Sequence, residues 1–289
     1  MVFVVSSYAY PFVKELPFRI EVATEKTIRE PLQNVREDAC IIFAYPDARL
    51  MRYFRNAPLK IATSHRFVSW LYCNRIINFS RKKSLLHEAQ LNFHLLRGIG
   101  INYIPSFEEI IEMVSQNALE TREKPPVDTF NVVIHPHSGG HTVEWGFNNF
   151  MQLSEILVSS HDNIRITIVG SKAERAAFRD VPLHPRIVDI RGETTPQQLI
   201  DAIKKADLFI GNSSGPMHIA GILHKKVVAF FPPVRWLSSR RWSPLTPHSI
   251  IFEPAGPCDK CLSGACPCLH GITPQEVHKK ISEVMISTG

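Results

Sequence analysis

The sequence lacks any apolar run that approaches the roughly 18 residues of a membrane-spanning helix. Its first residues, MVFVVSSYAYPFVKE, have no basic segment and too short an apolar core for a secretory leader. No fixed-period repeat or low-complexity tract is present, which excludes solenoid and fibrous architectures. The 33 lysines and arginines outnumber the 27 acids by a small, scattered surplus. That surplus argues against a nucleic-acid partner and suits an anionic ligand or an anionic membrane surface.

Cysteine is also scarce, and its placement excludes a secreted disulfide scaffold. The chain has 289 residues and six cysteines, so it can bury a sizeable core without disulfides, and we expect a cytoplasmic protein. Four of them are spaced C-x2-C-x4-C-x-C: Cys258, Cys261, Cys266 and Cys268. This spacing allows a tetrahedral zinc site or a reduced loop, and the tight second pair favours the loop. We therefore expect no metal and no cofactor, with Cys40 and Cys73 in the core.

The most informative stretch is 206–233, which reads ADLFIGNSSGPMHIAGILHKKVVAFFPP. Leu208 to Ile210 has the length of a buried strand, a helix is expected after the turn, and Val227 to Phe231 is the next strand. Either Ser213 or Ser214 can cap that helix. This unit is typical of a parallel sheet, and its turn points backbone N–H groups and a helix dipole towards a site that suits phosphate. The alternative is a capped helix with a surface histidine.

Strands and helices alternate on both sides of a charged segment at 118–129, which contains Pro125 and Pro126. That composition is typical of an interdomain linker. We predict one α/β domain over residues 1–120 and a second over residues 128–289. Two such Rossmann-like domains bind ligands at the carboxyl ends of their parallel strands, in a cleft between the domains.

The predicted elements follow from apolar runs and their periodicity. In the first half, strands are predicted at Val2–Val5, Arg19–Val22, Asp38–Phe43 and Lys60–Ala62. Helices there are predicted at Tyr8–Glu15, 47–55, 65–73 and 84–98, the last closed by Gly98. In the second half, the further strands are predicted at Val132–His135, Ile164–Val169, Ile187–Ile190 and Ile250–Phe252. The further helices are predicted at Asn149–Ser159, 172–179, Pro196–Lys205 with Thr194 or Thr195 as its cap, and 274–286.

With these motifs in this order, the chain resembles glycosyltransferase family 9, the heptosyltransferases of the lipopolysaccharide inner core. The segments that carry the resemblance are GNSSGPMHIAGILHKKVVAFFPP at 211–233, HPHSGG…EWGFNNF at 135–150, RGETTPQQLIDAIKKADLFIGN at 191–212, TSHRFVSWLYCNR at 63–75 and LLHEAQLNFHLLRGIGI at 85–101. The resemblance implies a GT-B fold whose C-terminal domain holds a nucleotide-sugar donor. It implies inverting transfer of a heptose, or a related sugar, from a donor such as ADP-heptose to the lipopolysaccharide core. The implied partners are that donor and an anionic acceptor, with peripheral contact at the inner membrane surface.

The resemblance also implies site residues on both sides of the reaction. The donor-side turn is matched by Ser213, Ser214, Gly215, Pro216, Met217 and His218. Glu174 matches a position that accepts hydrogen bonds from a ribose, with a solvated helix residue as the alternative, and Ser138 lies where a hydroxyl could meet phosphate. A larger residue in place of Gly215 is expected to stand where the phosphate must approach. It could also not adopt a positive φ, if Gly215 uses one. On the acceptor side His65 and Arg66 match the family, with packing and a surface salt bridge as the alternatives, and a capping or packed role is expected for His87.

Three departures from the family pattern bear on the chemistry. The family's first strand and its acid-bearing loop have no match in residues 1–20, so this β–α unit is expected to be missing and the general base is not found. The loop at 137–145 has Val143 in place of the usual cation, and Ser213 stands where an aspartate is common. Glu15 and Asp38 are the only nearby acids that could substitute as the base. The alternative function is therefore a catalytically impaired nucleotide-sugar-binding remnant, which would bind donor with little turnover.

Overall fold

The computed structural model describes residues 2–6, 19–23, 38–116, 129–140, 142–177, 183–256, 261 and 267–283. It divides the chain into two compact units, residues 1–110 and 111–289, and each is considered by itself. The predicted helix at Tyr8–Glu15 and nearly all of the 118–129 segment lie outside the described residues.

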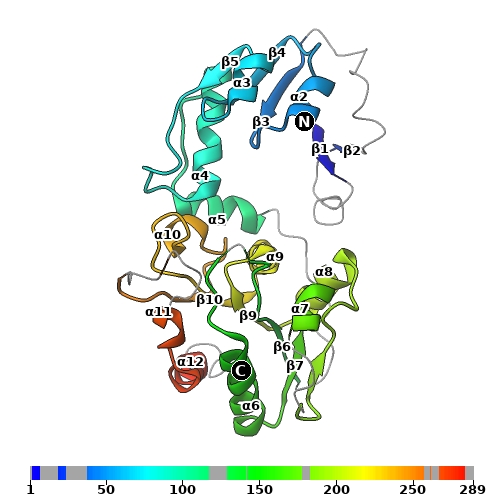
Figure 1. Cartoon of the computed structure of the whole chain (residues 1–289), viewed down its shortest axis with the longest axis vertical. Coiled ribbons are helices and arrows are strands. Elements are labelled where there is room, and N and C mark those ends of the chain that lie inside the picture. The colour runs from blue at the N-terminus through cyan, green and yellow to red at the C-terminus, as the bar shows by residue number, and fades with distance from the viewer. Residues whose placement is uncertain are drawn as a thin grey trace. The chain divides into compact units, whose positions relative to one another are not determined.

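The second unit contains a six-stranded parallel sheet (Figure 1). Its strands are β6 (Phe130–His135), β7 (Ile164–Ile168), β8 (Ile187–Asp189), β9 (Leu208–Asn212), β10 (Lys226–Phe230) and β11 (Ser249–Phe252). They lie in the order β11-β10-β9-β6-β7-β8. The chain thus builds outwards from β6 to one edge, returns to the centre with β9, and builds to the other edge. This order is that of a doubly wound sheet.

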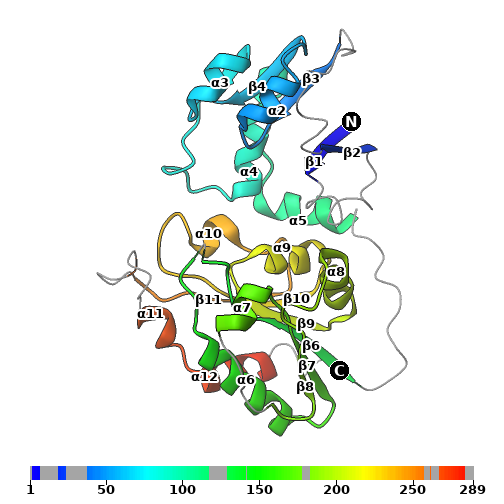
Figure 2. The same cartoon turned by 45° about the vertical axis from the view of Figure 1, so that its right-hand side comes forward.

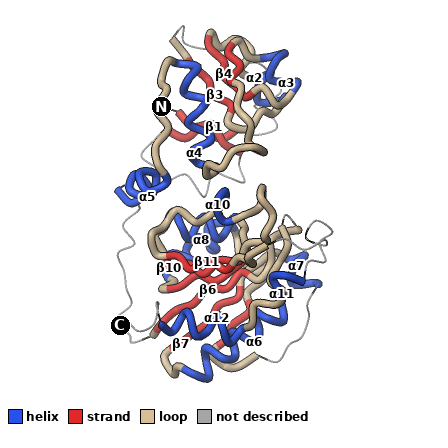
Figure 3. The backbone as a smooth tube through the Cα atoms, turned by 90° about the vertical axis from the view of Figure 1, so that its left-hand side faces the viewer, coloured by secondary structure: helices blue, strands red, loops and turns tan. Residues whose placement is uncertain are grey.

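Helices cover both faces of this sheet, which is why its central strands read as continuous apolar runs. They are α6 (Phe147–Ser160), α7 (Lys172–Ala177), α8 (Pro196–Lys205), α9 (Gly215–Ile222), α10 (Ser239–Trp242), α11 (Pro267–His270) and α12 (Pro274–Ile281). Helices α6 and α12 pack together on one face, and α8 and α9 pack together on the other (Figures 2 and 3).

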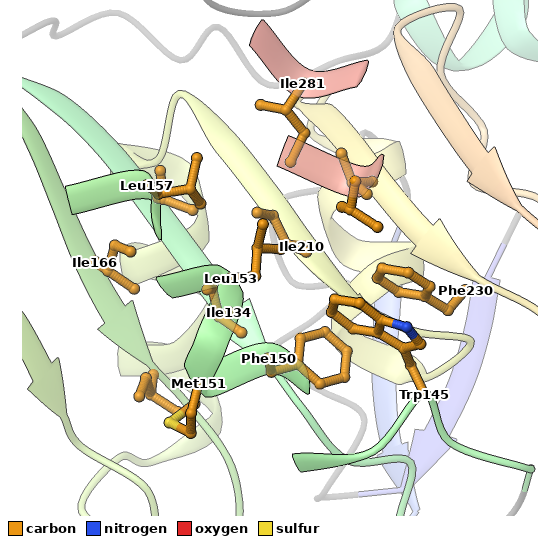
Figure 4. Close-up of a cluster of buried hydrophobic side chains, with 14 of the residues drawn as sticks. Ile134, Trp145, Phe150, Met151, Leu153, Leu157, Ile166, Ile210, Phe230 and Ile281 are labelled. Carbon is orange, nitrogen blue, oxygen red and sulfur yellow. The ribbon is translucent and has the colours of Figure 1, made fainter. Parts of the chain in front are cut away.

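An aromatic cluster anchors the core between α6 and the sheet (Figure 4). Trp145 is fully buried, and its ring stacks on Phe230 with centroids 4.2 Å apart. Phe150 meets the Trp145 ring edge-on at 4.8 Å. The indole N–H, which would be costly to bury without a partner, donates to the Ile272 carbonyl at 2.7 Å. The loop that precedes α6 is therefore fixed to the sheet by its tryptophan.

The first unit contains a three-stranded parallel sheet in the order β3-β4-β5, and β1 and β2 pair in parallel. Its strands are β1 (Val2–Ser6), β2 (Arg19–Ala23), β3 (Cys40–Phe43), β4 (Leu59–Thr63) and β5 (Arg75–Ile77). Its helices are α2 (Ala48–Tyr53), α3 (Phe67–Tyr72), α4 (Glu88–Phe93), the 3₁₀ helix η2 (His94–Ile99) and α5 (Phe107–Gln116), which runs across the division at residue 110. The described part of the chain includes no helix long and apolar enough to cross a membrane.

Two predictions about the first unit are wrong. The helix predicted over 84–98 begins only after His87, whose Nδ1 accepts a hydrogen bond from the Ala89 N–H at 3.1 Å. From His94 onwards it continues as the 3₁₀ helix η2. It is closed by Gly100 at φ 84°, in place of the predicted Gly98. Cys40 is exposed at the start of β3, one of the two outer strands of the three-stranded sheet, and Cys73 is only partly buried. The capping role expected for His87 is confirmed.

Candidate functional site

The centre of the six-stranded sheet marks the point at which its winding reverses. Strands β6 and β9 are neighbours there, with His135 paired to Gly211 at the carboxyl end. The chain leaves β6 towards one edge and β9 towards the other, so the two following loops separate. Doubly wound sheets bind ligands in the crevice that such a reversal creates. The loop 136–146 and the turn at 213–214 flank this position.

The turn after β9 brings the start of α9 to this position. The Ser213 N–H donates to the Phe230 carbonyl at 3.2 Å, which carries the chain past the strand end. Ser214 occupies the N-cap position of α9, as predicted for one of the two serines. Among the described residues, however, its side chain makes no capping bond. The first N–H groups of α9 therefore keep the anion-binding capacity of a helix N-terminus.

Gly215 opens α9 with ordinary backbone geometry, which corrects one expectation. Its φ is not positive, so no left-handed conformation requires glycine there. A Cβ placed on Gly215 would meet no described atom within 4 Å. The glycine therefore keeps space open above the helix start, and a larger residue would fill that space without straining the backbone.

A buried histidine joins this turn to α7. His135, at the end of β6, is 6% exposed. Its Nδ1 lies 3.0 Å from Oγ of Ser214, and its Nε2 lies 3.7 Å from Oε2 of Glu174. That same Oε2 accepts the Ser171 N–H at 2.6 Å, and Ser171 Oγ accepts the Glu174 N–H in return. Glu174 thus caps α7 and faces the β6 end, so the alternative of a fully solvated side chain is wrong.

The environment of Glu174 has a large effect on its ionisation. Burial alone would raise the pKa of this carboxyl. The hydrogen-bonding and charge interactions with His135 and the bonds from Ser171 outweigh burial and lower the pKa to about 2. The carboxylate is therefore held in its charged form, as an acceptor.

This shift predicts a pH-dependent contribution to stability. A carboxyl with a lowered folded-state pKa stabilises the fold above its ordinary pKa of 4.5 and loses that effect as the pH falls towards 2. Glu174→Gln should therefore lower the free energy of unfolding by about 2 kcal/mol near pH 7, after a discount for partial exposure. In urea titrations the difference from wild type should shrink steadily below about pH 4.5. A difference that stays constant down to acid pH would contradict the assignment.

The loop 136–146 is held by a second carboxylate. Glu144 Oε1 accepts from the Ser138 N–H at 2.7 Å and from the Ser138 hydroxyl at 2.8 Å, and its Oε2 lies 3.4 Å from Nδ1 of His137. Burial would raise the pKa of Glu144, but His137 and Ser138 together lower it. Val143, which stands where a cation was expected, packs into the hydrophobic core. Ser138 would have to exchange its bond with Glu144 to contact a phosphate.

Arg191 is a buried cation that contacts this loop. It is 3% exposed and forks onto Asp189, with Nε and Nη2 bonds of 2.9–3.2 Å. Its Nη1 donates to the Glu174 carbonyl at 3.3 Å and lies 3.3 Å from Nε2 of His137. The guanidinium also lies 4.7 Å from the Phe147 ring centroid. Arg191 thus connects the ends of β6, β8 and the start of α6.

Asn212 fixes the two flanking segments to each other. It is fully buried at the end of β9. Its Oδ1 accepts the Trp145 N–H at 2.9 Å, and its Nδ2 donates to the Pro136 carbonyl at 2.7 Å. Sequence reasoning missed Asn212, His135, His137 and Arg191 as site residues. The available signal was a polar residue placed directly at the end of an apolar strand run.

Comparison with known protein families identifies the family of this chain. The model of glycosyltransferase family 9 (heptosyltransferase) matches residues 55–270. The chain belongs to this family.

The relatives of this family 9 protein are distant. It is similar to lipooligosaccharide heptosyltransferase 2 of Campylobacter jejuni strain 81116, at 27% identity over 51% of this chain and 48% of that protein. It is also similar to lipooligosaccharide heptosyltransferase 2 of Haemophilus ducreyi, at 27% identity over 39% of this chain and 34% of that protein. The matched part thus spans about half, or less, of the length of these curated relatives.

Solved structures establish the fold of the family 9 chain. E. coli ADP-heptose lps heptosyltransferase II gives a TM-score of 0.71 at 15% identity, over 99% of this chain and 89% of that one. E. coli heptosyltransferase WaaC with ADP gives 0.64 at 12% identity, over 97% and 88%. The predicted α/β fold of the GT-B type, with parallel sheets, is therefore confirmed.

The residues assigned to the acceptor side of the family 9 chain lie in the first unit. His65 follows β4, and its Nε2 contacts the Phe79 carbonyl. Arg66 is exposed, and its guanidinium donates to the Tyr45 hydroxyl at 2.7 Å and stacks 4.5 Å from the Tyr45 ring centroid. The salt bridge offered as the alternative for Arg66 is therefore replaced by an aromatic partner.

The cysteine cluster of the family 9 chain is only partly described. Cys261 and Cys268 lie with their sulfur atoms 3.9 Å apart, whereas Cys258 and Cys266 lie outside the described residues. Within the described ranges no group of three or more His, Cys, Asp or Glu residues could hold a metal ion. Of the two residues predicted as the cap of α8, Thr194 and Thr195, the structure uses Thr195, whose hydroxyl accepts the Gln198 N–H.

Proposed function

We propose that the chain transfers a heptose, or a closely related sugar, from ADP-heptose to a lipopolysaccharide-core acceptor. The observation that carries the proposal is the turn after β9, which holds the start of α9 at the reversal point of the sheet. That arrangement suits the diphosphate of a nucleotide sugar. Support comes from relatives named as heptosyltransferases, and from structures of WaaC solved with ADP and with ADP-2-deoxy-2-fluoro heptose.

The carboxyl ends of β6 and β9, with the start of α9, are best suited to the departure of the diphosphate. When the glycosidic bond breaks, negative charge grows on the phosphate, and preorganised N–H groups stabilise it most. The N–H groups of Gly215 and Met217, at the positive end of the α9 dipole, are proposed to bind that phosphate. His218, in the same turn and with its ring 6.0 Å from the Trp242 ring, is proposed as a further donor.

The ribose is proposed to lie beside Glu174. Oε2 of this carboxylate makes the contacts with Ser171 and His135, and Oε1 is the oxygen that we propose for a ribose hydroxyl. The lowered pKa of Glu174 keeps the carboxylate ionised, and hence a hydrogen-bond acceptor, near neutral pH. His135 holds both Glu174 and Ser214, so it is proposed to position the ribose and phosphate contacts relative to each other.

The acceptor is proposed to be an anionic, lipid-linked saccharide at the cytoplasmic face of the inner membrane. Arg66 and His65 are proposed acceptor-side residues, since each follows the carboxyl end of β4. Ser138 is proposed as a phosphate contact, provided that its hydroxyl leaves Glu144 when the donor binds.

The experiment that tests this function measures ADP release from ADP-heptose with and without a heptose-free core acceptor. The proposal predicts acceptor-dependent release, and a product whose mass has increased by one heptose. Donor binding without acceptor-dependent release would overturn transfer and favour the nucleotide-sugar-binding remnant.

A further inference from the structure

One side chain of the candidate site has a polar partner beside each of its ring nitrogens. His135, at the end of β6, is 6% exposed. Its Nδ1 lies 3.0 Å from Ser214 Oγ, and its Nε2 lies 3.7 Å from Glu174 Oε2. Histidine is the side chain that most readily gains or loses a proton near neutral pH. The proton of His135 can therefore affect both neighbours, which are the proposed phosphate and ribose contacts.

When His135 is neutral, Glu174 decides which ring nitrogen holds the proton. The Glu174 carboxylate is ionised and can only accept hydrogen bonds. A lone pair on Nε2 would face this negative charge, so the proton is favoured on Nε2, and Nδ1 is left as an acceptor. The Ser214 hydroxyl has a single hydrogen, which it then donates to Nδ1. The hydroxyl has only lone pairs left for a ligand, and these repel phosphate oxygens.

Protonation of His135 reverses this hydrogen bond. Both nitrogens of an imidazolium are donors, so Nδ1 donates to Ser214 Oγ while Nε2–H stays beside Glu174. The serine hydrogen is then available to a phosphate oxygen. Ser214 is only partly buried, and among the described residues its side chain makes no capping bond to α9. The freed hydroxyl hydrogen thus adds a donor beside the first N–H groups of that helix.

The charged groups around His135 oppose one another. Glu174 on α7 favours the imidazolium, whereas the positive end of the α9 dipole disfavours it. Arg191, which donates to the Glu174 carbonyl at 3.3 Å, also disfavours it but is paired with Asp189. His137, on the adjoining loop, lies 3.3 Å from Arg191. A diphosphate at the start of α9 would offset the opposing positive charge, and so favour the proton on His135.

We propose that binding of the nucleotide-sugar donor takes up a proton at Nδ1 of His135, which turns the Ser214 hydroxyl towards the diphosphate. The imidazolium also adds positive charge beside the N–H groups of α9. The proton comes from solvent, and its uptake changes no covalent bond of the donor. His135 acts through Ser214 and is therefore a positioning residue. This inference rests on the proposed function in placing the diphosphate at the start of α9.

Isothermal calorimetry with ADP-heptose and no acceptor tests the coupling. Both phosphates of this donor are diesters, so the charge of the ligand stays constant near neutral pH. The wild-type affinity should rise about tenfold from about pH 8.5 to about pH 5.5, which is the size of one charge-assisted hydrogen bond. At about pH 7 the binding enthalpy should differ between Pipes and Tris buffers in the sense of proton uptake.

Two variants separate this coupling from a structural role. The amide of His135→Gln can donate to Glu174 and accept from Ser214, as the neutral histidine does, but it cannot be protonated. Its affinity should be independent of pH and close to the wild-type value at about pH 8.5. Ser214→Ala keeps the imidazole and removes the hydroxyl, so its pH effect should fall below about threefold, the remainder being screened charge. The matched control is His248→Gln, an exposed position just before β11, which should behave as wild type.

His218→Ala checks the other histidine of the turn, and it should bind more weakly at every pH while keeping the wild-type ratio of affinities. The proposal is overturned if wild type binds equally well at both pH values, or if His135→Gln or Ser214→Ala keeps the full ratio. Loss of the ratio in His218→Ala alone would also overturn it. The buffer dependence needs no variant, so the test holds even if a substitution at His135 disturbs the fold. Binding that ignores pH leaves the proposed donor site standing, whereas no binding at any pH removes that site and the coupling together.

Discussion

Gly215→Val should lower the affinity for ADP by about 10- to 100-fold and leave the fold intact. The effect is expected because a branched side chain would occupy the space above the first turn of α9, where the phosphate must approach the backbone N–H groups. The stability should change little, since Gly215 has an ordinary φ and no described atom lies within 4 Å of the added Cβ. Isothermal calorimetry gives the affinity, and thermal unfolding gives the stability.

The matched control for this substitution is Gly256→Val. Gly256 also has no described atom within 4 Å of an added Cβ and no positive φ, but it lies outside the turn at 213–218. Its ADP affinity should equal that of wild type. The ADP affinity of His218→Ala should lie between those of Gly215→Val and wild type, because one side-chain donor is removed while the helix start remains. Equal affinity in all four proteins would rule out this turn as the phosphate site.

Arg191→Met should destabilise the second unit by about 3–5 kcal/mol. Arg191 is 3% exposed and neutralises Asp189, whose side chain is 17% exposed, so the substitution leaves a largely buried carboxylate without its partner. It also removes the bond to the Glu174 carbonyl and the contact with His137. Urea unfolding should show a lower midpoint with little change in the slope of the transition.

Two further variants separate this effect from a general loss of charge. Lys280→Met breaks an exposed pair with Glu283, where the side chains are 54% and 50% exposed, and should cost less than about 1 kcal/mol. Arg191→Met/Asp189→Asn removes both charges and should recover part of the lost stability. If Arg191→Met costs no more than Lys280→Met, the buried pair does not hold the strand ends together.

The sequence was sufficient to predict elements with strong local signals. The apolar runs on both sides of the turn at 213–214 predicted β9, α9 and β10, and Thr195 followed by Pro196 predicted the start of α8. Both features depend on neighbours within a few residues. The closing glycine was predicted at residue 98, whereas η2 continues past that position and ends at Gly100. The packing of η2 against β4 and β5 is a tertiary contact that local sequence does not reveal.

The contacts that build the candidate site could not be predicted in the same way. His135 meets Ser214 across 79 positions of sequence, and Asn212 meets Trp145 across 67. Arg191 reaches His137 across 54 positions. Such contacts exist only because the doubly wound order brings the carboxyl ends of β6, β8 and β9 to the same side of the sheet. The side chain of Ser213 or Ser214 was expected to cap α9. The long-range contact of Ser214 with His135 competes with that local capping bond.

The most direct test of the donor site is backbone amide hydrogen exchange, followed by mass spectrometry, with and without saturating ADP. We expect slower exchange in peptides that cover the turn at 213–218 and the loop 136–140, and no change in α12. The second unit also has a cavity of about 450 Å³ beside α8, lined in part by Gln198, Asp201 and Lys205. Protection confined to that cavity, or the absence of protection at 213–218 under saturating ADP, would contradict a donor site at this turn.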